Sequence, residues 1–306
     1  MENSLGDYEG YKSGYVALIG KPNVGKSTLL NNYLGQPIAA VSFRPQTTQR
    51  RQLGILTTPE AQIIFVDTPG LHGGDFKLSE FINQEAHFAM LDADLLLFIV
   101  DVSQMPDGED VQLADQVKQL RKDIPKLLVL NKVDLVDPDD LNQHVTAFQN
   151  LLVFDDQVKL SATTEEGREA LLEHVANLLP SGPQFYPEEQ ITATNEREIA
   201  EDLIRAAAMQ NLQEELPYVL FVRVNDYKLR EEGKRYIHAT VFVERDTQKG
   251  ILIGKGGSMI KTISTTARNA IESMSGESVF LELQVKVEKN WRNNPAFLQR
   301  YGLSHD

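Results

Sequence analysis

The chain has 306 residues, of which 42% are hydrophobic and 24% charged, a balance typical of a globular protein with room for two domains. It contains no cysteine, which excludes disulfide bonds and thiolate zinc sites and fits a reducing cytosol. The acidic N-terminus lacks the apolar centre of a signal peptide, and the longest apolar run, residues 95–100, is too short to span a bilayer. We therefore expect a cytoplasmic protein, with peripheral contact to the inner membrane left open.

The net charge of −14 is unevenly distributed along the chain. Residues 1–180 hold 14 lysines and arginines against 26 aspartates and glutamates, whereas residues 217–306 hold 14 against 10. The average therefore combines an acidic part with a mildly basic one. Binding of a polyanion such as nucleic acid is expected only in the second part.

Residues 14–180, which follow a segment 1–13 that we expect to be flexible, alternate short apolar runs with amphipathic stretches. The runs "YVALIG", "QIIFVDTPG", "DLLLFIVDVS" and "KLLVLNKVD" each predict a buried strand that ends in polar or glycine residues. This alternation predicts an α/β domain with a mostly parallel sheet and helices on both faces. Ligands of such sheets bind at the carboxyl ends of the strands, where the polar motifs fall here.

Three prolines and a glycine mark residues 181–195 and their approach as a linker. In residues 196–306 the predicted order is helix, strand, strand, helix, glycine loop, helix and strand, followed by a helical tail. The strands follow one another with few crossovers. This order predicts a second, smaller α+β domain.

The stretch "GKPNVGKST", residues 20–28, matches the spacing G-x-x-x-x-G-K-[ST] between a predicted strand and a predicted helix. In this motif the backbone N–H groups surround the β-phosphate, the lysine reaches the β- and γ-phosphates, and the hydroxyl binds Mg²⁺. Lys26 and Ser27 are therefore the expected phosphate and metal ligands. The nucleotide-binding residues expected from this stretch are Gly20, Lys21, Pro22, Asn23, Val24, Gly25, Lys26, Ser27 and Thr28.

Two further stretches are expected to complete the phosphate and Mg²⁺ site. "DTPGL" ends a strand, so that Asp67 can hold Mg²⁺ through a water and the Gly70 N–H can meet the γ-phosphate. "RPQTTQR" lies where a switch segment belongs, and its Thr48, rather than Thr47, is our choice for the threonine that closes over Mg²⁺ and the γ-phosphate. The residues expected to contact nucleotide from "DTPGL" are Asp67, Thr68, Pro69, Gly70 and Leu71.

The stretch "NKVD" at residues 131–134 selects the base. An aspartate at its end can accept hydrogen bonds from N1–H and the 2-amino group of guanine, whereas adenine would leave this carboxylate unpaired. "SA" follows a short strand further along, where a backbone N–H can meet guanine O6. A guanine nucleotide, GTP or GDP, is therefore the expected cofactor together with Mg²⁺. The base-contacting residues expected are Asn131, Lys132, Val133, Asp134, Ser161 and Ala162.

A second glycine-rich loop, residues 254–257, lies between the two predicted helices in the basic part of the chain. Its G-x-x-G spacing, inside a strand–strand–helix–helix–strand unit, predicts the loop with which KH domains clamp single-stranded RNA. Glycines let the RNA backbone approach, and the following helix presents free N–H groups. The expected RNA-binding residues are Ile251, Ile253, Gly254, Lys255, Gly256, Gly257, Lys261 and Arg268.

Taken together, "GKPNVGKSTLLN", "PQTTQ", "FVDTPGLH", "NKVD", "GPQFYP", "ELPY", "GKGGSMIKTI" and "LELQVKVEKNW" resemble the Era family of bacterial GTPases, which carry a C-terminal KH domain. The resemblance extends over residues 14–303. It implies a monomeric factor that matures the small ribosomal subunit, the 30S subunit, and binds the 3′ end of its rRNA. Asn23 resembles the loop asparagine of potassium-dependent relatives, which implies K⁺ as a further cofactor. The catalytic residues expected are Lys26, Asn23, Thr48 and Gly70.

Leu71 occupies the position at which Ras-like GTPases carry the glutamine that orients the attacking water. Leucine cannot do so, and we expect slow intrinsic hydrolysis. An alternative is an RNA-binding assembly protein that binds GTP and scarcely hydrolyses it. A tRNA-modifying GTPase would need a C-terminal cysteine, which the chain lacks.

Overall fold

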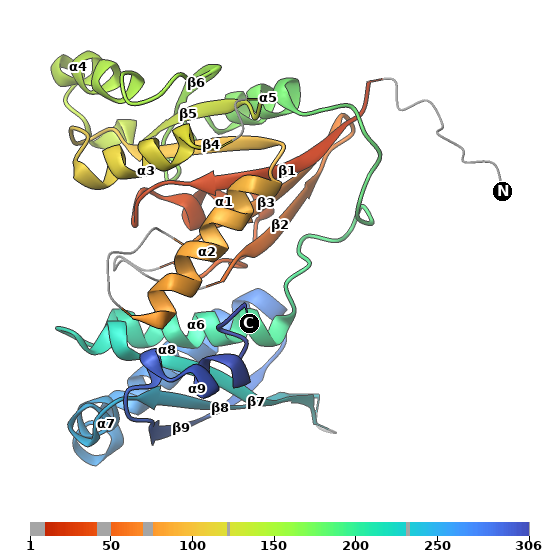
Figure 1. The fold of residues 1–306 in the computed structure, drawn as a ribbon. Helices are drawn as coiled ribbons and strands as arrows, with labels where there is room; N and C mark the ends of the chain where they lie inside the picture. The colour runs from red at the N-terminus through yellow and green to blue at the C-terminus, as the bar shows by residue number, and fades with distance from the viewer. Residues whose placement is uncertain (1–9, 42–49, 70–75, 121–122, 231–232, 306) are drawn as a thin grey trace. The chain divides into compact units, whose positions relative to one another are not determined.

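Two compact units make up the chain, with the division between Ala193 and Thr194 (Figure 1). The computed structural model describes residues 10–41, 50–69, 76–120, 123–230 and 233–305. Two short segments of the earlier part of the chain, which include residues 35–41 and 77–84, group with the second unit.

The first unit is an α/β domain with a six-stranded sheet in the order β2-β3-β1-β4-β5-β6. β2 is antiparallel to β3, and the other neighbours are parallel. Its strands are β1 (Lys12–Ile19), β2 (Gln52–Thr57), β3 (Ala61–Asp67), β4 (Leu95–Asp101), β5 (Lys126–Asn131) and β6 (Asp156–Lys159). Its helices are α1 (Lys26–Leu34), the part of α2 (Lys77–Asp92) from residue 85 onward, α3 (Gly108–Lys118), α4 (Pro138–Gln149) and α5 (Arg168–Leu178). The predicted mostly parallel sheet is confirmed, with an antiparallel edge strand added.

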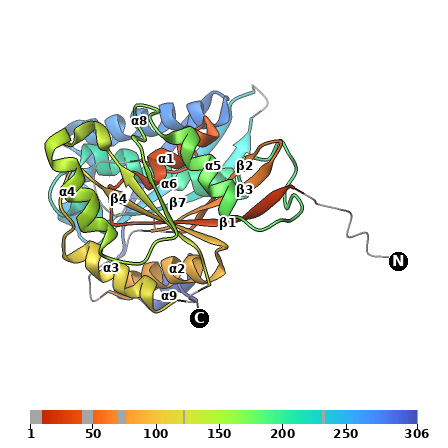
Figure 2. The same ribbon diagram turned by 90° about the horizontal axis from the view of Figure 1, so that it is seen from above.

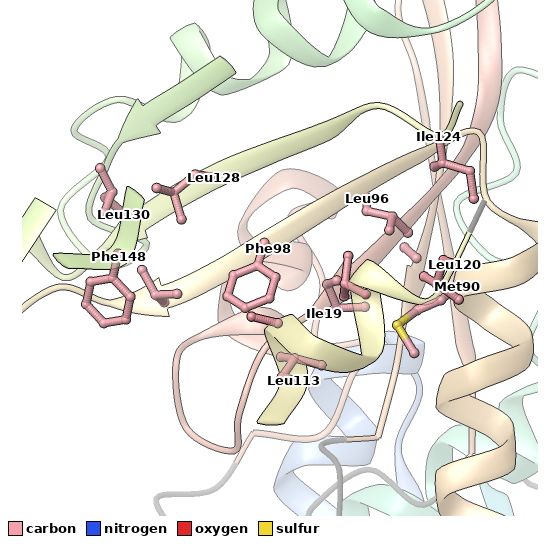
Figure 3. Packing of buried hydrophobic residues seen from close by; sticks show 14 of the residues in the cluster. Ile19, Met90, Leu96, Phe98, Leu113, Leu120, Ile124, Leu128, Leu130 and Phe148 are labelled. Carbon is pink, nitrogen blue, oxygen red and sulfur yellow. The ribbon is translucent and has the colours of Figure 1, made fainter. Parts of the chain in front are cut away.

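Helices cover both faces of this sheet, which explains why β4 and β5 read as unbroken apolar runs. Figure 2 shows α2 and α3 on one side of the strands and α1 and α5 on the other. Figure 3 shows the buried core beneath α3, where Leu113 packs with Ile19 of β1 and Phe98 of β4. Other buried members of this cluster are Met90, Leu96, Leu120, Ile124, Leu128, Leu130 and Phe148. The core fixes the strands, and the strand ends carry the motifs.

The predicted linker is bound along the first unit rather than free of it. The Gln62 side-chain oxygen accepts hydrogen bonds from the backbone N–H groups of Phe185, at 2.7 Å, and Tyr186, at 2.9 Å. Further along, the Ile55 N–H donates to the Ile191 carbonyl at 2.8 Å, so that the edge strand β2 is partly covered. The segment thus has fixed backbone partners before α6 begins.

The second unit is an α+β domain in which helices pack on a three-stranded sheet, β7-β8-β9. β7 and β8 are antiparallel, with a bulge between Val224 and Asp226, and β8 and β9 are parallel. Its strands are β7 (Phe221–Leu229), β8 (Arg235–Val243) and β9 (Val279–Val287), and its helices are α6 (Glu196–Asn211), α7 (Asp246–Ile253), α8 (Ser258–Ser275) and α9 (Pro295–Arg300). The predicted smaller α+β domain is confirmed.

Aromatic side chains fill the part of this second unit that lies beneath α9. Phe221 and Phe242 pack with Phe297, with ring centroids 5.5 and 5.2 Å away, and Trp291 is fully buried beside them.

None of the helices within the described ranges has the length and apolar character needed to cross a lipid bilayer.

Candidate functional site

The motif stretches of the first unit fall at the carboxyl ends of four of its five parallel strands. The loop 20–25 follows β1, residues 67–69 end β3, residues 131–134 end β5, and residues 161–162 come shortly after β6. Because β1, β3, β4, β5 and β6 are parallel, their carboxyl ends lie along one edge of the sheet. Thr47, Thr48, Gly70 and Leu71 lie outside the described residues.

Lys26, the first residue of α1, folds its ammonium group back into the loop before the helix. Its Nζ donates hydrogen bonds to the Gly20 carbonyl at 2.8 Å and to the Lys21 carbonyl at 3.1 Å, and the side chain is buried. Burial lowers the pKa of Lys26 to about 8, and the nearby Asp67 carboxylate opposes this shift. An anion that entered the loop would favour the charged form of Lys26 and would thereby oppose the effect of burial.

Two glycines let the loop pack closely against the rest of the site. A Cβ at Gly20 would lie 2.3 Å from the Ile99 carbonyl oxygen, and one at Gly25 would lie 2.3 Å from the amide nitrogen of Asn131. Gly25 also has a φ of +104°, which L side chains rarely adopt. Both positions therefore require glycine for steric reasons, as the motif spacing predicts.

The end of β3 contacts both α1 and β1. The Ser27 hydroxyl donates to Asp67 Oδ2 at 2.7 Å, and the Thr68 hydroxyl donates to the Leu18 carbonyl at 2.7 Å. Asp67 is fully buried. A hydroxyl and a carboxylate meeting in this way are oxygen donors of the kind that Mg²⁺ prefers, so the residues present fit that ion.

The Asn131 side chain joins three of the motif stretches. Its Nδ2 donates to the Val24 carbonyl at 2.6 Å, and its Oδ1 accepts from the Ala162 N–H at 2.9 Å. The Asn32 side chain of α1 also donates to the Ala162 carbonyl. In this structure the Ala162 N–H expected to meet guanine O6 is therefore already hydrogen-bonded to Asn131, and a base would have to share or displace that bond.

Lys132 and Asp134 have different surroundings, although both belong to the same stretch. Lys132 has a φ of +67°, and its Nζ is 2.5 Å from Asp101 Oδ2 at the end of β4. Burial would raise the pKa of Asp101, but hydrogen bonds from Lys132 and Ser103 lower it below its ordinary value. Asp134 is exposed, and none of the described residues makes a hydrogen bond to its carboxylate. The Asp134 carboxylate is therefore accessible to a base.

Asp101 is a site residue that the sequence reasoning missed. It ends β4 after a fully apolar run, the same signal by which Asp67 and Asn131 were identified.

Lys21 also differs from the expectation for the loop, because its ammonium contacts Asp107 and Asp110 of the α3 N-terminus and not the loop interior. Asn23 is exposed and has a φ of +65°, a conformation that asparagine tolerates better than most residues.

The glycine loop of the second unit, residues 254–257, links α7 to α8. Gly254 packs tightly, because a Cβ there would lie 2.8 Å from Met259. Gly256 and Gly257 both have positive φ, at +62° and +79°, and a Cβ at either would have no neighbour within 4 Å. Lys255 is exposed at the tip. The loop therefore presents open backbone beside the α8 N-terminus, where an anionic backbone could approach.

The other predicted RNA-binding residues lie on the two helices beside this loop. Ile251 is 58% exposed, whereas Ile253 is half-buried at the end of α7. Residues two apart on a helix point about 200° apart, so these two side chains lie on different faces of α7. Lys261 and Arg268 are both exposed on α8 and, being seven residues apart, share one face.

Comparison with known families separates the same two parts of the chain. Residues 15–132 match the family described as 50S ribosome-binding GTPase, and residues 215–292 match the KH domain family. The matches cover the nucleotide loops up to Lys132 and the α7–loop–α8 region, respectively. The fold and its loops thus define a GTPase that carries a C-terminal KH domain.

Sequence similarity to known proteins extends over nearly the full chain. The chain is 41% identical to GTPase Era of Ruminiclostridium cellulolyticum over 95% of its length and 97% of that protein, and 42% identical to GTPase Era of Lacticaseibacillus paracasei over 96% and 97%. A crystal structure of Era in complex with MgGDPNP and nucleotides 1506–1542 of 16S ribosomal RNA superimposes with a TM-score of 0.89, at 34% identity over 96% of this chain and 99% of that one. A variant of Aquifex aeolicus Era bound to GDP·AlF4⁻ gives the same score at 33% identity, over 96% and 99% of the two chains. The chain belongs to the Era family of GTPases.

Proposed function

We propose that the chain binds and hydrolyses GTP with Mg²⁺, and binds the single-stranded 3′ end of small-subunit rRNA through its KH domain in a nucleotide-dependent manner, as a maturation factor of the 30S subunit. Support comes from the relative that was crystallised with MgGDPNP and 16S rRNA, which matches both units of this chain. The mildly basic charge of residues 217–306 suits an RNA partner.

One observation carries the nucleotide part of this proposal. Asn131 bridges Val24 and Ala162, which lie 107 and 31 residues away in sequence. Asn131 thus connects the phosphate loop to the two loops that are expected beside the base. Such a connection is expected where one ligand must contact all three loops. The exposed Asp134 carboxylate is then the group that accepts the N1–H and 2-amino protons of guanine.

We assign the phosphate chemistry to residues of β1, α1 and β3. Lys26 moves from the loop carbonyls to the phosphates and neutralises charge as the terminal phosphoryl group leaves. Ser27 and Asp67 are the described residues that would hold Mg²⁺, which when bound neutralises charge on the phosphate oxygens. Thr48 and the Gly70 N–H complete this assignment from outside the described residues.

Hydrolysis is proposed to be slow without a further trigger, because Leu71 cannot orient water. Asn23 is proposed to support a K⁺ ion that supplies positive charge beside the phosphates. Turnover in KCl should then exceed turnover in NaCl at equal ionic strength. Asn23→Gly, which keeps the positive-φ loop conformation and removes the side chain, should abolish the difference. Equal rates in the two salts would leave Asn23 a loop residue only.

The competing proposal is an RNA-binding assembly protein that binds GTP and scarcely hydrolyses it. Single-turnover GTP cleavage, measured with and without K⁺, decides between the two. We further propose a cytoplasmic monomer, with peripheral membrane contact as an additional property. Size-exclusion chromatography with light scattering and flotation with anionic vesicles test these two points.

The nucleotide proposal is tested by base selectivity. Asp134→Asn replaces an acceptor of guanine protons by a group that donates to a 2-oxo base, and should lose GTP affinity while gaining xanthosine triphosphate affinity. Asp140→Asn, at another exposed aspartate close by in α4, is the matched control and should leave both affinities unchanged. Unchanged GTP affinity in Asp134→Asn would refute the guanine assignment.

The RNA proposal is tested at the open glycine. Gly256→Asp adds a negative side chain where phosphates would approach, and should abolish binding of a single-stranded oligonucleotide with the rRNA 3′-end sequence while GDP affinity persists. Gly276→Asp is the matched control, since Gly276 has a similar φ of +69° and equally open space at the far end of α8. If both variants bind RNA like the unmutated chain, the RNA site lies elsewhere.

A further inference from the structure

Lys21 lies in the phosphate-binding loop, but its side chain leaves the loop. Its Nζ contacts Asp107 Oδ2 at 2.7 Å and Asp110 Oδ2 at 2.9 Å, and only 14% of the side chain is exposed. Asp107 is the N-cap of α3, and Asp110 is the third residue of that helix. One ammonium group therefore connects the loop after β1 to the start of α3.

The same residue also supports Lys26 through its main chain. The Lys21 carbonyl accepts a hydrogen bond from Lys26 Nζ at 3.1 Å. A shift of Lys21 would consequently move a carbonyl that holds the lysine proposed to contact the phosphates. The backbone of Lys21 belongs to the phosphate cradle, and its side chain belongs to the α3 contact.

The α3 end of this contact is rigid. Asp107 Oδ1 accepts from the backbone N–H groups of Glu109 and Asp110, while Asp110 Oδ2 accepts from the Asp107 N–H at 3.0 Å. This reciprocal pair is a capping box, which holds both carboxylates in place independently of their contact with Lys21. A side chain that joins such a prearranged pair is held in one position.

One ammonium group, that of Lys21, faces two carboxylates at this contact. Asp110 is almost completely buried, and burial raises its pKa above the ordinary value despite its hydrogen bonds. Burial by itself would lower the pKa of Lys21, but the hydrogen bonds to Asp107 and Asp110 raise it. Without the ammonium group, two acidic side chains would face a loop that is proposed to receive phosphates.

We propose that Lys21 is a positioning residue, whose ion pair with Asp107 and Asp110 holds the phosphate-binding loop against α3 and offsets these two carboxylates. This inference rests on the proposed function, because it concerns the same nucleotide site. Lys21 acts on the phosphates through Lys26 and the loop backbone. Loss of its charge weakens GDP and GTP binding together, since both nucleotides share the α- and β-phosphates.

The experiment measures affinity and dissociation rate of a fluorescent GDP and a fluorescent GTP analogue on the full chain. Lys21→Met is expected to weaken both by about ten- to a hundredfold, as lost charge-assisted hydrogen bonds would. Lys21→Arg keeps the charge and is expected to restore affinity to near that of the unmutated chain. Lys118→Met, which removes a lysine from an exposed ion pair with Asp115 on the same helix, is the matched control and should change neither affinity.

A mutant cycle separates this role from a general loss of structure. Asp107→Asn with Asp110→Asn is expected to weaken binding less than Lys21→Met does, because it removes the anchor and also the repulsion. Adding Lys21→Met to that pair is expected to cost little more. The melting temperature of each nucleotide-free variant shows whether it is folded, and Lys21→Gln replaces Lys21→Met if the latter does not fold.

Two results would overturn the inference. Equal affinity of Lys21→Met and the unmutated chain would show that the contact does not position the loop. Simple addition of the separate losses in the combined variant would show that Lys21 and the two aspartates act independently. Absence of GDP binding by the unmutated chain would instead overturn the proposed function on which the inference rests.

Discussion

Replacing Asn131 by alanine removes the side chain that ties the phosphate loop to the loop after β6. Asn131 is 1% exposed, and its amide makes two hydrogen bonds, one to the Val24 carbonyl and one from the Ala162 N–H. Val24 and Ala162 are themselves buried. Asn131→Ala therefore leaves a buried acceptor and a buried donor without their partner.

The size of the effect follows from these two groups. An unsatisfied buried donor or acceptor costs about 1–3 kcal/mol, so the two groups together should lower the free energy of unfolding of the first unit by roughly 2–6 kcal/mol. The lower part of this range is expected if water enters beside the exposed Asn23. GDP affinity should also fall, because Val24 and Ala162 would no longer hold their loops in one arrangement, and a loss of at least about tenfold corresponds to 1.4 kcal/mol.

Urea unfolding followed by circular dichroism, with and without GDP, measures both effects. Asn142→Ala on the exposed side of α4 is the matched control, and its free energy of unfolding should change by less than about 0.5 kcal/mol. A free energy of unfolding and a GDP affinity for Asn131→Ala that both equal those of the control would refute the reasoning.

Three further outcomes are expected. Gly25→Ala should displace the Asn131 amide and weaken GDP binding. In an Asn131→Ala background, the additional loss of GDP affinity caused by Gly25→Ala should shrink to the part that comes from backbone strain. Equilibrium titration of both variants with GDP measures the two losses. Ser27→Ala should weaken GDP binding in the presence of Mg²⁺ but not in excess chelator, and equal losses in both conditions would argue against a metal role. The lowered pKa of Lys26, about 8 in the nucleotide-free chain, predicts that GDP binding takes up a proton above that pH, because phosphate favours the charged amine. GDP affinity should then be full below pH 8 and fall as the pH rises above it. Lys26→Arg should remove this pH dependence. Calorimetry in buffers of different ionisation enthalpy should detect no proton uptake if the reasoning is wrong.

The sequence by itself determined the class of each domain and the location of its loops. Unbroken apolar runs predicted β4 and β5 because a parallel sheet covered on both faces needs no polar side chain along those strands. The spacing of Gly20, Gly25 and Lys26 also predicted the phosphate loop, because this spacing between a strand and a helix is a recurring local motif. Local rules of this kind can be read from neighbouring residues alone.

The antiparallel edge strand β2 and the path of the segment before α6 were decided only by tertiary structure. Residues 181–195 read as a linker from their prolines, but Gln62 and β2 supply hydrogen-bond partners that no local pattern encodes. Similarly, Ile251 and Ile253 were both expected to bind RNA, and the helical backbone of α7 points their side chains to different faces.

The same limit applies to the roles of individual polar side chains. Lys21 and Lys26 are both lysines of one loop, and nothing in the spacing says that one ammonium turns inward and the other reaches α3. Asn131 likewise belongs to a base-recognition stretch, yet its amide contacts Val24 and Ala162. The directions of the Lys21 and Asn131 side chains depend on residues 31 to 107 positions away, whose proximity arises only when the strands assemble into one sheet.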